Sequence, residues 1–256
     1  MTLALANVGA AAPWRDPQLT SLHRLPMHTL RHDDPAKRLE LDGTWRFQLL
    51  RAPDAEPGAD WAEAEVPGCW TRQGFDDLPH YTNVQMPFAG FPPDIPDDNP
   101  TGVYERDIEA PADWRGGRIV LHVGAAESVL IASIDGELVG ISKDSHLAAE
   151  FDVTEALAAP GPHRLTLRVV KWSDATYVED QDQWWHGGIT RPVYLYTTAA
   201  TYLADVRAIG GLADDLTTGT LDLTVSTTFA DGRPVHSWLV EAELGAPDGA
   251  PLEGGP

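Results

Sequence analysis

The residues that could do chemistry in this chain are concentrated in one stretch, YVEDQDQWWHGGITRPVYLY, at positions 177–196. Four acids stand in or just before it: Asp174, Glu179, Asp180 and Asp182. Clustered carboxylates repel one another unless a cation or hydrogen-bond donors hold them. Their hard oxygen atoms suit Na⁺, Mg²⁺ or Ca²⁺ better than zinc. The stretch is therefore a candidate cation site, or else an acidic loop on the surface.

Aromatic residues follow the acids directly. Trp184 and Trp185 could offer an apolar face to a sugar ring, while nearby carboxylates and amides bond its hydroxyls. The alternative is that one tryptophan belongs to the core and the loop is merely polar. His186 could donate to a sugar, although a histidine beside two glycines more often serves backbone packing. Composition does not decide between a sugar site and a polar corner.

Charge and cysteine content limit the possible partners. The formal net charge of −21 opposes binding to nucleic acids and to anionic membranes, because both would be repelled. The single cysteine, Cys69, cannot form an intramolecular disulfide and is expected to be a small packed side chain. No segment approaches the roughly 20 apolar residues of a membrane span, and the start lacks the basic region of a signal peptide. Cytoplasmic residence is the resulting expectation.

The elements that must position these residues are predicted to be β-strands. Between residues 38 and 198 about eight to ten runs rich in Val, Ile, Thr and aromatic residues are separated by turn signals, and Asp135-Gly136 is a hairpin turn signal. This spacing is typical of an antiparallel β-sandwich. A proline-rich loop from Thr71 to Gly102 interrupts the pattern, and loops of that length are usually functional.

Both ends of the chain differ from this middle part. Residues 1–37 show no helical or strand periodicity and are expected to be an arm that packs over another surface. His28 and His32 within it have the spacing of a helical metal pair, but flanking prolines favour solvated or capping histidines. Residues 199–256 predict three strands (201–211, 219–232 and 234–247), too few residues for a complete immunoglobulin-like domain of about 100. We therefore expect a fragment of a longer protein.

Single residues outside the acidic stretch carry simpler expectations. Trp45, Trp61 and Trp70 are expected to pack in the core or between domains rather than against a ligand. Asn99, immediately before Pro100, is expected to form a turn.

Several long motifs occur in a fixed order: LDGTWRFQL, VPGCWTRQGFDDLPHYTNVQMPF, PDDNPTGVYERDI and VVKWSDATYVEDQDQWWHGGITRPVYLY. Together they resemble the N-terminal region of the family 2 β-galactosidases. The resemblance implies an all-β chain: an arm at 1–37, a jelly-roll sugar-binding domain at 38–198, and a partial immunoglobulin-like β-sandwich at 199–256. The related β-glucuronidases and β-mannosidases share that fold but generally lack the ExDQDxW string, which favours β-galactosidase.

The resemblance also implies roles for individual residues. Asn83, in the YTNV motif, matches an asparagine that reaches into the galactose pocket. Asp182 matches an aspartate that contacts galactose and ligates an active-site Na⁺. Asp174 matches a ligand of a structural Mg²⁺ near the arm. Lys143 stands where an amide ligand of that Mg²⁺ would be. Its positive charge would repel a metal ion, which argues against the Mg²⁺ site.

Catalysis is expected to lie outside this chain. A retaining glycosidase needs two carboxyl groups about 5 to 5.5 Å apart, and in the family both come from a barrel that follows these domains. Glu179, Asp180 and Asp182 therefore have a supporting role, no catalytic residue is expected here, and the chain alone should hydrolyse nothing. The expected substrate is a β-galactoside such as lactose.

Other functions remain open at this point. The chain could be a galactoside-binding, lectin-like module, a structural fragment that assembles with a missing barrel, or part of another family 2 enzyme such as a β-glucuronidase. A lectin is disfavoured, because two or three hydrogen bonds at ~0.5 to 1.5 kcal/mol each do not offset the cost of association. In the family the arm takes part in subunit packing, which implies a homo-oligomer.

Overall fold

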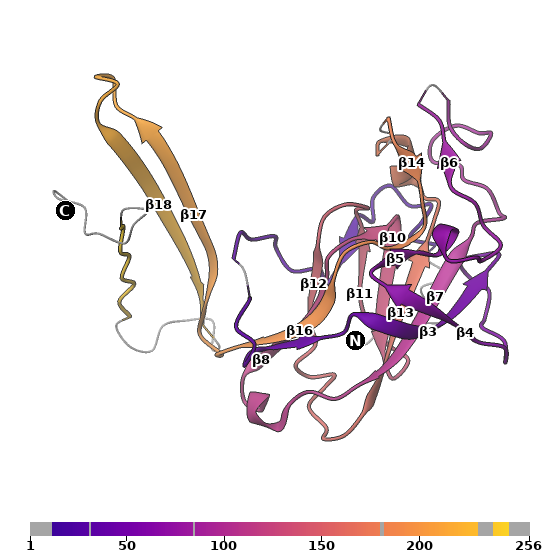
Figure 1. Cartoon of the computed structure of the whole chain (residues 1–256), viewed down its shortest axis with the longest axis horizontal. Coiled ribbons are helices and arrows are strands. Elements are labelled where there is room, and N and C mark those ends of the chain that lie inside the picture. Colours follow the sequence, from indigo (N-terminus) through magenta and orange to yellow (C-terminus); the bar gives the residue numbers. More distant parts are fainter. Residues whose placement is uncertain (1–11, 31, 84, 180–181, 230–237, 246–256) are drawn as a thin grey trace.

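The computed structural model describes residues 12–30, 32–83, 85–179, 182–229 and 238–245. Most of them form a sandwich of two antiparallel sheets (Figure 1). The larger sheet has the order β1-β11-β10-β13-β7-β3-β4, with β1 Ser21–Leu22, β11 Glu137–Lys143, β10 Val129–Ile134, β13 His163–Val170, β7 Thr101–Ile108, β3 Gly43–Leu50 and β4 Ala62–Val66. The smaller sheet has the order β12-β8-β16-β2, with β12 Ala149–Asp152, β8 Arg118–Val123, β16 Val193–Thr198 and β2 Arg38–Glu40.

The core lies between the two sheets and follows from the alternation of side chains along each strand. In β3, Trp45 and Phe47 are buried while Thr44 and Arg46 are exposed. Residues of the smaller sheet, such as Leu121 and Leu195, belong to the same buried cluster. Two inward faces that interdigitate in this way are how β-sandwiches build a core. The predicted all-β sandwich is confirmed.

The β10–β11 hairpin confirms the predicted turn. Asp135 and Gly136 connect the strands with φ values of 51° and 83°. A two-residue turn with positive φ at both positions matches the right-handed twist of paired strands, and Asp-Gly is a preferred sequence for it.

The arm packs along one edge of the sandwich. Its strand β1 pairs with β11, Arg24 forms a bridge to Phe151, and the Leu25 amide donates to the Glu150 carbonyl at 2.8 Å. Trp14 is only 5% exposed and packs against the outer side of the larger sheet. The described residues of the arm thus lie against the sandwich, and no helix forms around His28.

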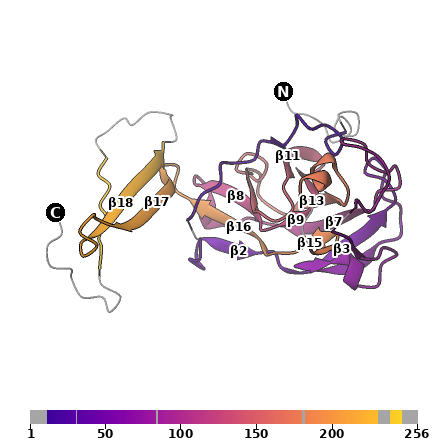
Figure 2. The same cartoon turned by 90° about the horizontal axis from the view of Figure 1, so that it is seen from above.

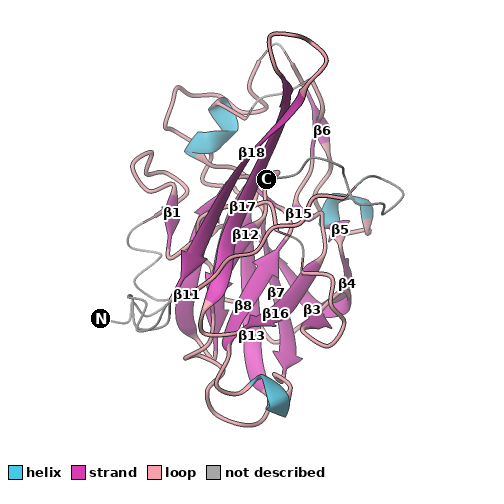
Figure 3. Cartoon of the chain, turned by 90° about the vertical axis from the view of Figure 1, so that its left-hand side faces the viewer, coloured by secondary structure: helices cyan, strands magenta, loops and turns pink. Residues whose placement is uncertain are grey.

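A long hairpin of β17 (Tyr202–Leu212) and β18 (Gly219–Thr228) projects away from the sandwich (Figures 1 and 2). Seen from the hairpin side, the two strands lie in front of the sandwich (Figure 3), and they pair with each other in a sheet of their own. It supplies the first two strands predicted after residue 198. Within the third predicted strand, residues 238–244 are not in strand conformation, and the rest of that segment lies mostly outside the described residues.

Small elements complete the end of the sandwich that carries the acidic stretch. A three-stranded sheet has the order β5-β15-β9, with β5 Gly68–Cys69, β15 Gly188–Ile189 and β9 Ala126–Glu127. A two-stranded sheet pairs β14 (Trp184–Trp185) with β6 (His80–Tyr81). The described residues also form three single-turn 3-10 helices, at Trp70–Arg72, Ala112–Trp114 and Asp174–Tyr177. In the described part of the chain, no helix is long and apolar enough to cross a membrane.

Candidate functional site

The pairing of β6 with β14 places the segments that carry the two predicted galactose-binding residues side by side. The register sets Trp184 opposite Tyr81 and Trp185 opposite His80. Asn83 follows β6 by two residues and Asp182 precedes β14 by two residues, so both lie next to this short pairing. Both residues are exposed. Two segments about 100 positions apart in sequence therefore present an amide and a carboxylate at one end of the sandwich.

Asp182 is oriented by a neighbour that the sequence did not single out. The Tyr81 hydroxyl donates a hydrogen bond of 2.5 Å to Oδ1 of Asp182. This bond is the main reason why the pKa of Tyr81 is raised. Among the described residues Oδ2 accepts no hydrogen bond, so one oxygen is free for a hydroxyl group or a cation. A single carboxylate oxygen fits Na⁺ as one ligand of several, with the others to come from elsewhere.

The two tryptophans have different environments. Trp184 is 56% exposed and its ring lies 5.5 Å from that of Tyr81, so the pair forms an exposed aromatic surface beside Asp182. Trp185 is 5% exposed and packs edge-on against Trp172. Successive residues of a strand point to opposite faces. Only Trp184 is therefore available to a sugar ring.

A buried ion pair holds the loop that leads to β6. The Lys171 ammonium lies 2.8 Å from both carboxylate oxygens of Asp77 and 3.1 Å from the Leu78 carbonyl. Trp70 donates its indole N–H to the same carboxylate at 2.7 Å. The Lys171 side chain is fully buried, and this burial lowers its pKa despite the neighbouring carboxylate. This network fixes the approach of the loop toward Tyr81 and Asn83.

The described acids of the stretch have separate hydrogen-bond partners. Glu179 accepts hydrogen bonds from the backbone N–H and the hydroxyl of Ser145, at 2.9 and 2.5 Å. Asp180 lies outside the described residues. Among the described residues, no three His, Cys, Asp or Glu side chains are arranged to hold a metal ion. The crowding inferred from sequence is thus relieved by separate hydrogen-bond donors.

A second buried carboxyl supports the turn that follows β14. Glu127 accepts a hydrogen bond from the backbone N–H of His186 at 3.1 Å, and burial raises its pKa to about 8. The His186 ring contacts the Thr71 hydroxyl at 2.9 Å. His186 therefore serves packing in this structure. Cys69 lies nearby, half-buried, and its burial raises the pKa of its thiol, consistent with a packed side chain.

Two sequence interpretations of core residues have different outcomes. Trp45 and Trp70 are buried, as predicted, whereas Trp61 is only partly buried. The prediction that Asn99 only forms a turn was wrong. Asn99 is fully buried, donates to the Trp172 carbonyl at 2.8 Å and accepts from the Trp172 N–H at 2.9 Å. Asn99 thus pairs both backbone polar groups of Trp172, 73 residues away, a contact that local sequence cannot reveal.

Asp174, the expected magnesium ligand, is already paired. The ammonium of Lys143 lies 2.6 Å from Oδ1 of Asp174 and contacts the carbonyls of Pro13 and Asp16 at 2.9 and 2.8 Å. These three oxygen atoms could be ligands of a divalent cation, but here they surround the positively charged ammonium of Lys143. The residues present therefore do not fit Mg²⁺ at this position.

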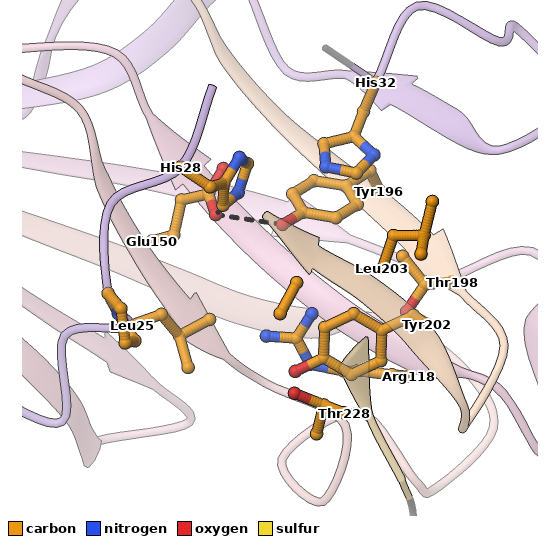
Figure 4. Close-up of a pocket in the computed structure, with 12 residues that line it drawn as sticks. Leu25, His28, His32, Arg118, Glu150, Tyr196, Thr198, Tyr202, Leu203 and Thr228 are labelled. Carbon is orange, nitrogen blue, oxygen red and sulfur yellow. Dashed lines mark hydrogen bonds and ion pairs between the residues drawn. The ribbon is translucent and has the colours of Figure 1, made fainter. Parts of the chain in front are cut away.

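Figure 4 shows a small pocket elsewhere, between the arm, the smaller sheet and the start of the hairpin. Here the Glu150 carboxylate accepts hydrogen bonds from His28 at 2.8 Å, His122 at 2.8 Å and Tyr196 at 2.9 Å. His32 stacks on Tyr196 with ring centroids 3.8 Å apart. His28 and His32 thus belong to a hydrogen-bonded and stacked cluster rather than to a metal site.

Comparisons with known proteins agree with this architecture. Residues 39–199 match the family described as "Glycosyl hydrolases family 2, sugar binding domain". The chain belongs to glycosyl hydrolase family 2. A β-galactosidase of Pectobacterium atrosepticum is 35% identical over 259 residues, covering 94% of this chain and 25% of that protein. A β-galactosidase of Enterobacter cloacae is 36% identical over 258 residues, covering 92% of this chain and 25% of that protein.

Solved β-glucuronidase structures share the fold. A β-glucuronidase of Faecalibacterium prausnitzii aligns with a TM-score of 0.56 at 24% identity, covering 81% of this chain and 40% of that one. A β-glucuronidase from an uncultured Clostridium species aligns with a TM-score of 0.56 at 21% identity, covering 78% and 36%. The chain spans about a quarter of the length of the curated family 2 relatives that it matches.

Proposed function

We propose that this chain is the N-terminal part of a retaining β-galactosidase and supplies accessory contacts to galactose and to a sodium ion. The observation that carries the proposal is the β6–β14 pairing, which places the segments of Asn83 and Asp182 side by side, with Tyr81 bonded to Asp182. The named relatives support galactoside rather than glucuronide as substrate, because β-galactosidases are 35% and 36% identical over more than nine-tenths of this chain.

The arrangement suits a supporting role at a sugar site. The amide of Asn83 and the free oxygen of Asp182 can bond galactose hydroxyls, and Trp184 can cover an apolar sugar face. A sodium ion at Asp182 would bridge the carboxylate to a hydroxyl. Binding energy from such groups, remote from the anomeric carbon, can be used to lower the barrier at the reacting centre.

The catalytic pair is proposed to lie in a barrel domain outside this sequence. Retaining hydrolysis needs a nucleophile and an acid/base about 5 to 5.5 Å apart. Here Glu179 accepts a hydrogen bond from Ser145, and Asp182 accepts one from Tyr81. We therefore do not assign these two carboxylates as the catalytic pair. The chain alone is accordingly proposed to be inactive. The full-length enzyme is proposed to be cytoplasmic and homo-oligomeric.

The test compares two substrates, and it compares the full-length protein with the chain of residues 1–256. The protein produced at full length should hydrolyse p-nitrophenyl β-galactoside with a much higher kcat/KM than p-nitrophenyl β-glucuronide, and the chain of residues 1–256 should hydrolyse neither. Preference for the glucuronide would assign the chain to the other enzyme class, which the fold of its solved neighbours also allows. Turnover by residues 1–256 alone would refute the proposed location of the catalytic groups.

A lectin-like module is the second candidate, favoured only by the exposed aromatic surface of Tyr81 and Trp184. Titrating residues 1–256 with galactose and NaCl, followed by protein NMR, distinguishes it. Saturable shifts that disappear in both Asn83→Ala and Asp182→Ala would favour independent sugar binding. Absence of shifts up to high millimolar galactose is the result expected for a site completed by another domain.

A further inference from the structure

The first observation behind this inference is the complete coordination of one buried ammonium group. Lys143 ends β11, and its side chain is 2% exposed. Its three N–H donors meet three oxygens: the Pro13 carbonyl at 2.9 Å, the Asp16 carbonyl at 2.8 Å and Oδ1 of Asp174 at 2.6 Å. An ammonium has three donors, so each one is satisfied.

The second observation is that these oxygens come from different parts of the chain. Two belong to the arm, and the third begins the single-turn helix Asp174–Tyr177 that precedes the acidic stretch. Two backbone hydrogen bonds join the same parts of the chain. The Asp174 N–H donates to the Trp14 carbonyl at 3.0 Å, and the Lys143 N–H donates to the Thr20 carbonyl at 3.0 Å. Lys143 therefore lies at the junction of arm, sheet and helix.

The third observation is the chemical kind of the cage. Two backbone carbonyls and one carboxylate are hard oxygen ligands of the type that a divalent cation takes in proteins. A carboxylate with 11% side-chain exposure needs a positive partner, because an unpaired buried charge is strongly unfavourable. The ammonium supplies that charge without a metal and in a fixed covalent position.

We propose that Lys143 replaces a structural divalent cation, so that a built-in ammonium anchors the arm to the sandwich and makes this junction independent of Mg²⁺. The anchor does not depend on the proposed galactoside chemistry. It predicts that the junction is unaffected by chelators in the natural sequence and becomes responsive to metal when the charge is removed.

The experiment measures the thermal unfolding midpoint of the full-length protein in EDTA and in MgCl₂, together with the rate of tryptic cleavage after Arg15 of the arm. The unsubstituted protein should show the same midpoint and the same slow cleavage in both conditions. Lys143→Gln removes the charge but offers an amide oxygen. It should lower the midpoint and speed cleavage several-fold in EDTA, with MgCl₂ reversing both changes.

Two further variants keep the outcome interpretable. Lys143→Met removes the charge without adding a ligand oxygen, and it should loosen the arm irrespective of MgCl₂. Lys37→Gln, at an exposed lysine of the same arm, should behave as the unsubstituted protein in both conditions. A midpoint of the unsubstituted protein that falls in EDTA and recovers with MgCl₂ would overturn the proposal. Arm cleavage in Lys143→Met as slow as in the unsubstituted protein would also overturn it.

Discussion

At the scale of single residues, buried charges determine how the candidate site is held. Asp77 and Lys171 form an ion pair with side chains 6% and 0% exposed, and Trp70 adds a hydrogen bond to the same carboxylate. Neither residue was singled out from the sequence, since an aspartate in a proline-rich loop and a lysine at a strand end look like ordinary surface charges. Their pairing depends on a contact 94 residues apart.

Removing one member of this pair should be costly. Asp77→Ala leaves the Lys171 ammonium buried without its carboxylate, and breaking a buried pair in this way typically costs about 3–5 kcal/mol. We expect a loss of that size in the free energy of unfolding, measured by urea denaturation. Asp76→Ala, at the exposed neighbouring position, should change it by less than about 0.5 kcal/mol. Equal effects of the two substitutions would contradict the anchoring role of Asp77.

At the scale of elements, regular strands were predictable and the site was not. The period-2 pattern of β3 and the Asp135-Gly136 turn are local signals, and both predictions are confirmed. The two-residue strands β6 and β14 carry no such signal, because their pairing is imposed by the loops around them. Sequence alone named Asn83 and Asp182 through a family resemblance, and could not name Tyr81, whose hydroxyl bonds Asp182.

The docking of the arm on the smaller sheet should depend on pH. The hydrogen bond to Glu150 raises the pKa of His28. Burial alone would raise the pKa of Glu150, but hydrogen bonds from His122 and His28 hold it well below its usual range. A raised histidine pKa contributes stability that is present below the unfolded value of 6.5 and is lost as pH rises through the folded value. The lowered Glu150 pKa contributes stability above its unfolded value of 4.5.

The contribution of the His28–Glu150 contact is thus largest near pH 5.5, where both groups are charged. Burial lowers the pKa of His32, which opposes this trend, so the test isolates His28 by substitution. The difference in unfolding free energy between the unsubstituted chain and His28→Gln should be larger at pH 5.5 than at pH 8.5. His146→Gln, at an exposed histidine that bonds Gln183 rather than Glu150, should show no such change. A pH-independent difference for His28→Gln would contradict the assignment.

At the scale of the whole molecule, the sandwich and the hairpin β17–β18 differ in how much of their apolar surface they bury. The sandwich encloses a continuous core, whereas the hairpin leaves large apolar side chains exposed: Ile209 44%, Leu212 64%, Leu221 44% and Leu223 40%. A two-stranded hairpin is marginally stable by itself in water. The sequence predicted a separate, partial domain after residue 198, but it did not show that the hairpin would leave so much apolar surface exposed.

Hydrogen exchange should report this difference. In residues 1–256, the amides of β17 and β18 are expected to exchange much faster than those of β10 and β13, which pair along six residues in the centre of the larger sheet. The β10–β11 hairpin, embedded in that sheet, serves as the internal comparison. Equal protection of the two hairpins, measured by mass spectrometry or NMR, would show that β17–β18 is stabilised by contacts other than those described.

The central claim is that Asn83 and Asp182 form one accessory galactose and sodium site. The most direct measurement is kcat/KM of the full-length protein on p-nitrophenyl β-galactoside, with and without NaCl, for Asn83→Ala, Asp182→Ala and the exposed control Asp113→Ala. The first two should lower kcat/KM by roughly 10- to 100-fold, as expected for lost hydrogen bonds that involve a charged group or ion, and Asp182→Ala should abolish the response to NaCl. Asp113→Ala should match the unsubstituted enzyme. Unchanged kcat/KM and an intact NaCl response in Asp182→Ala would contradict the account.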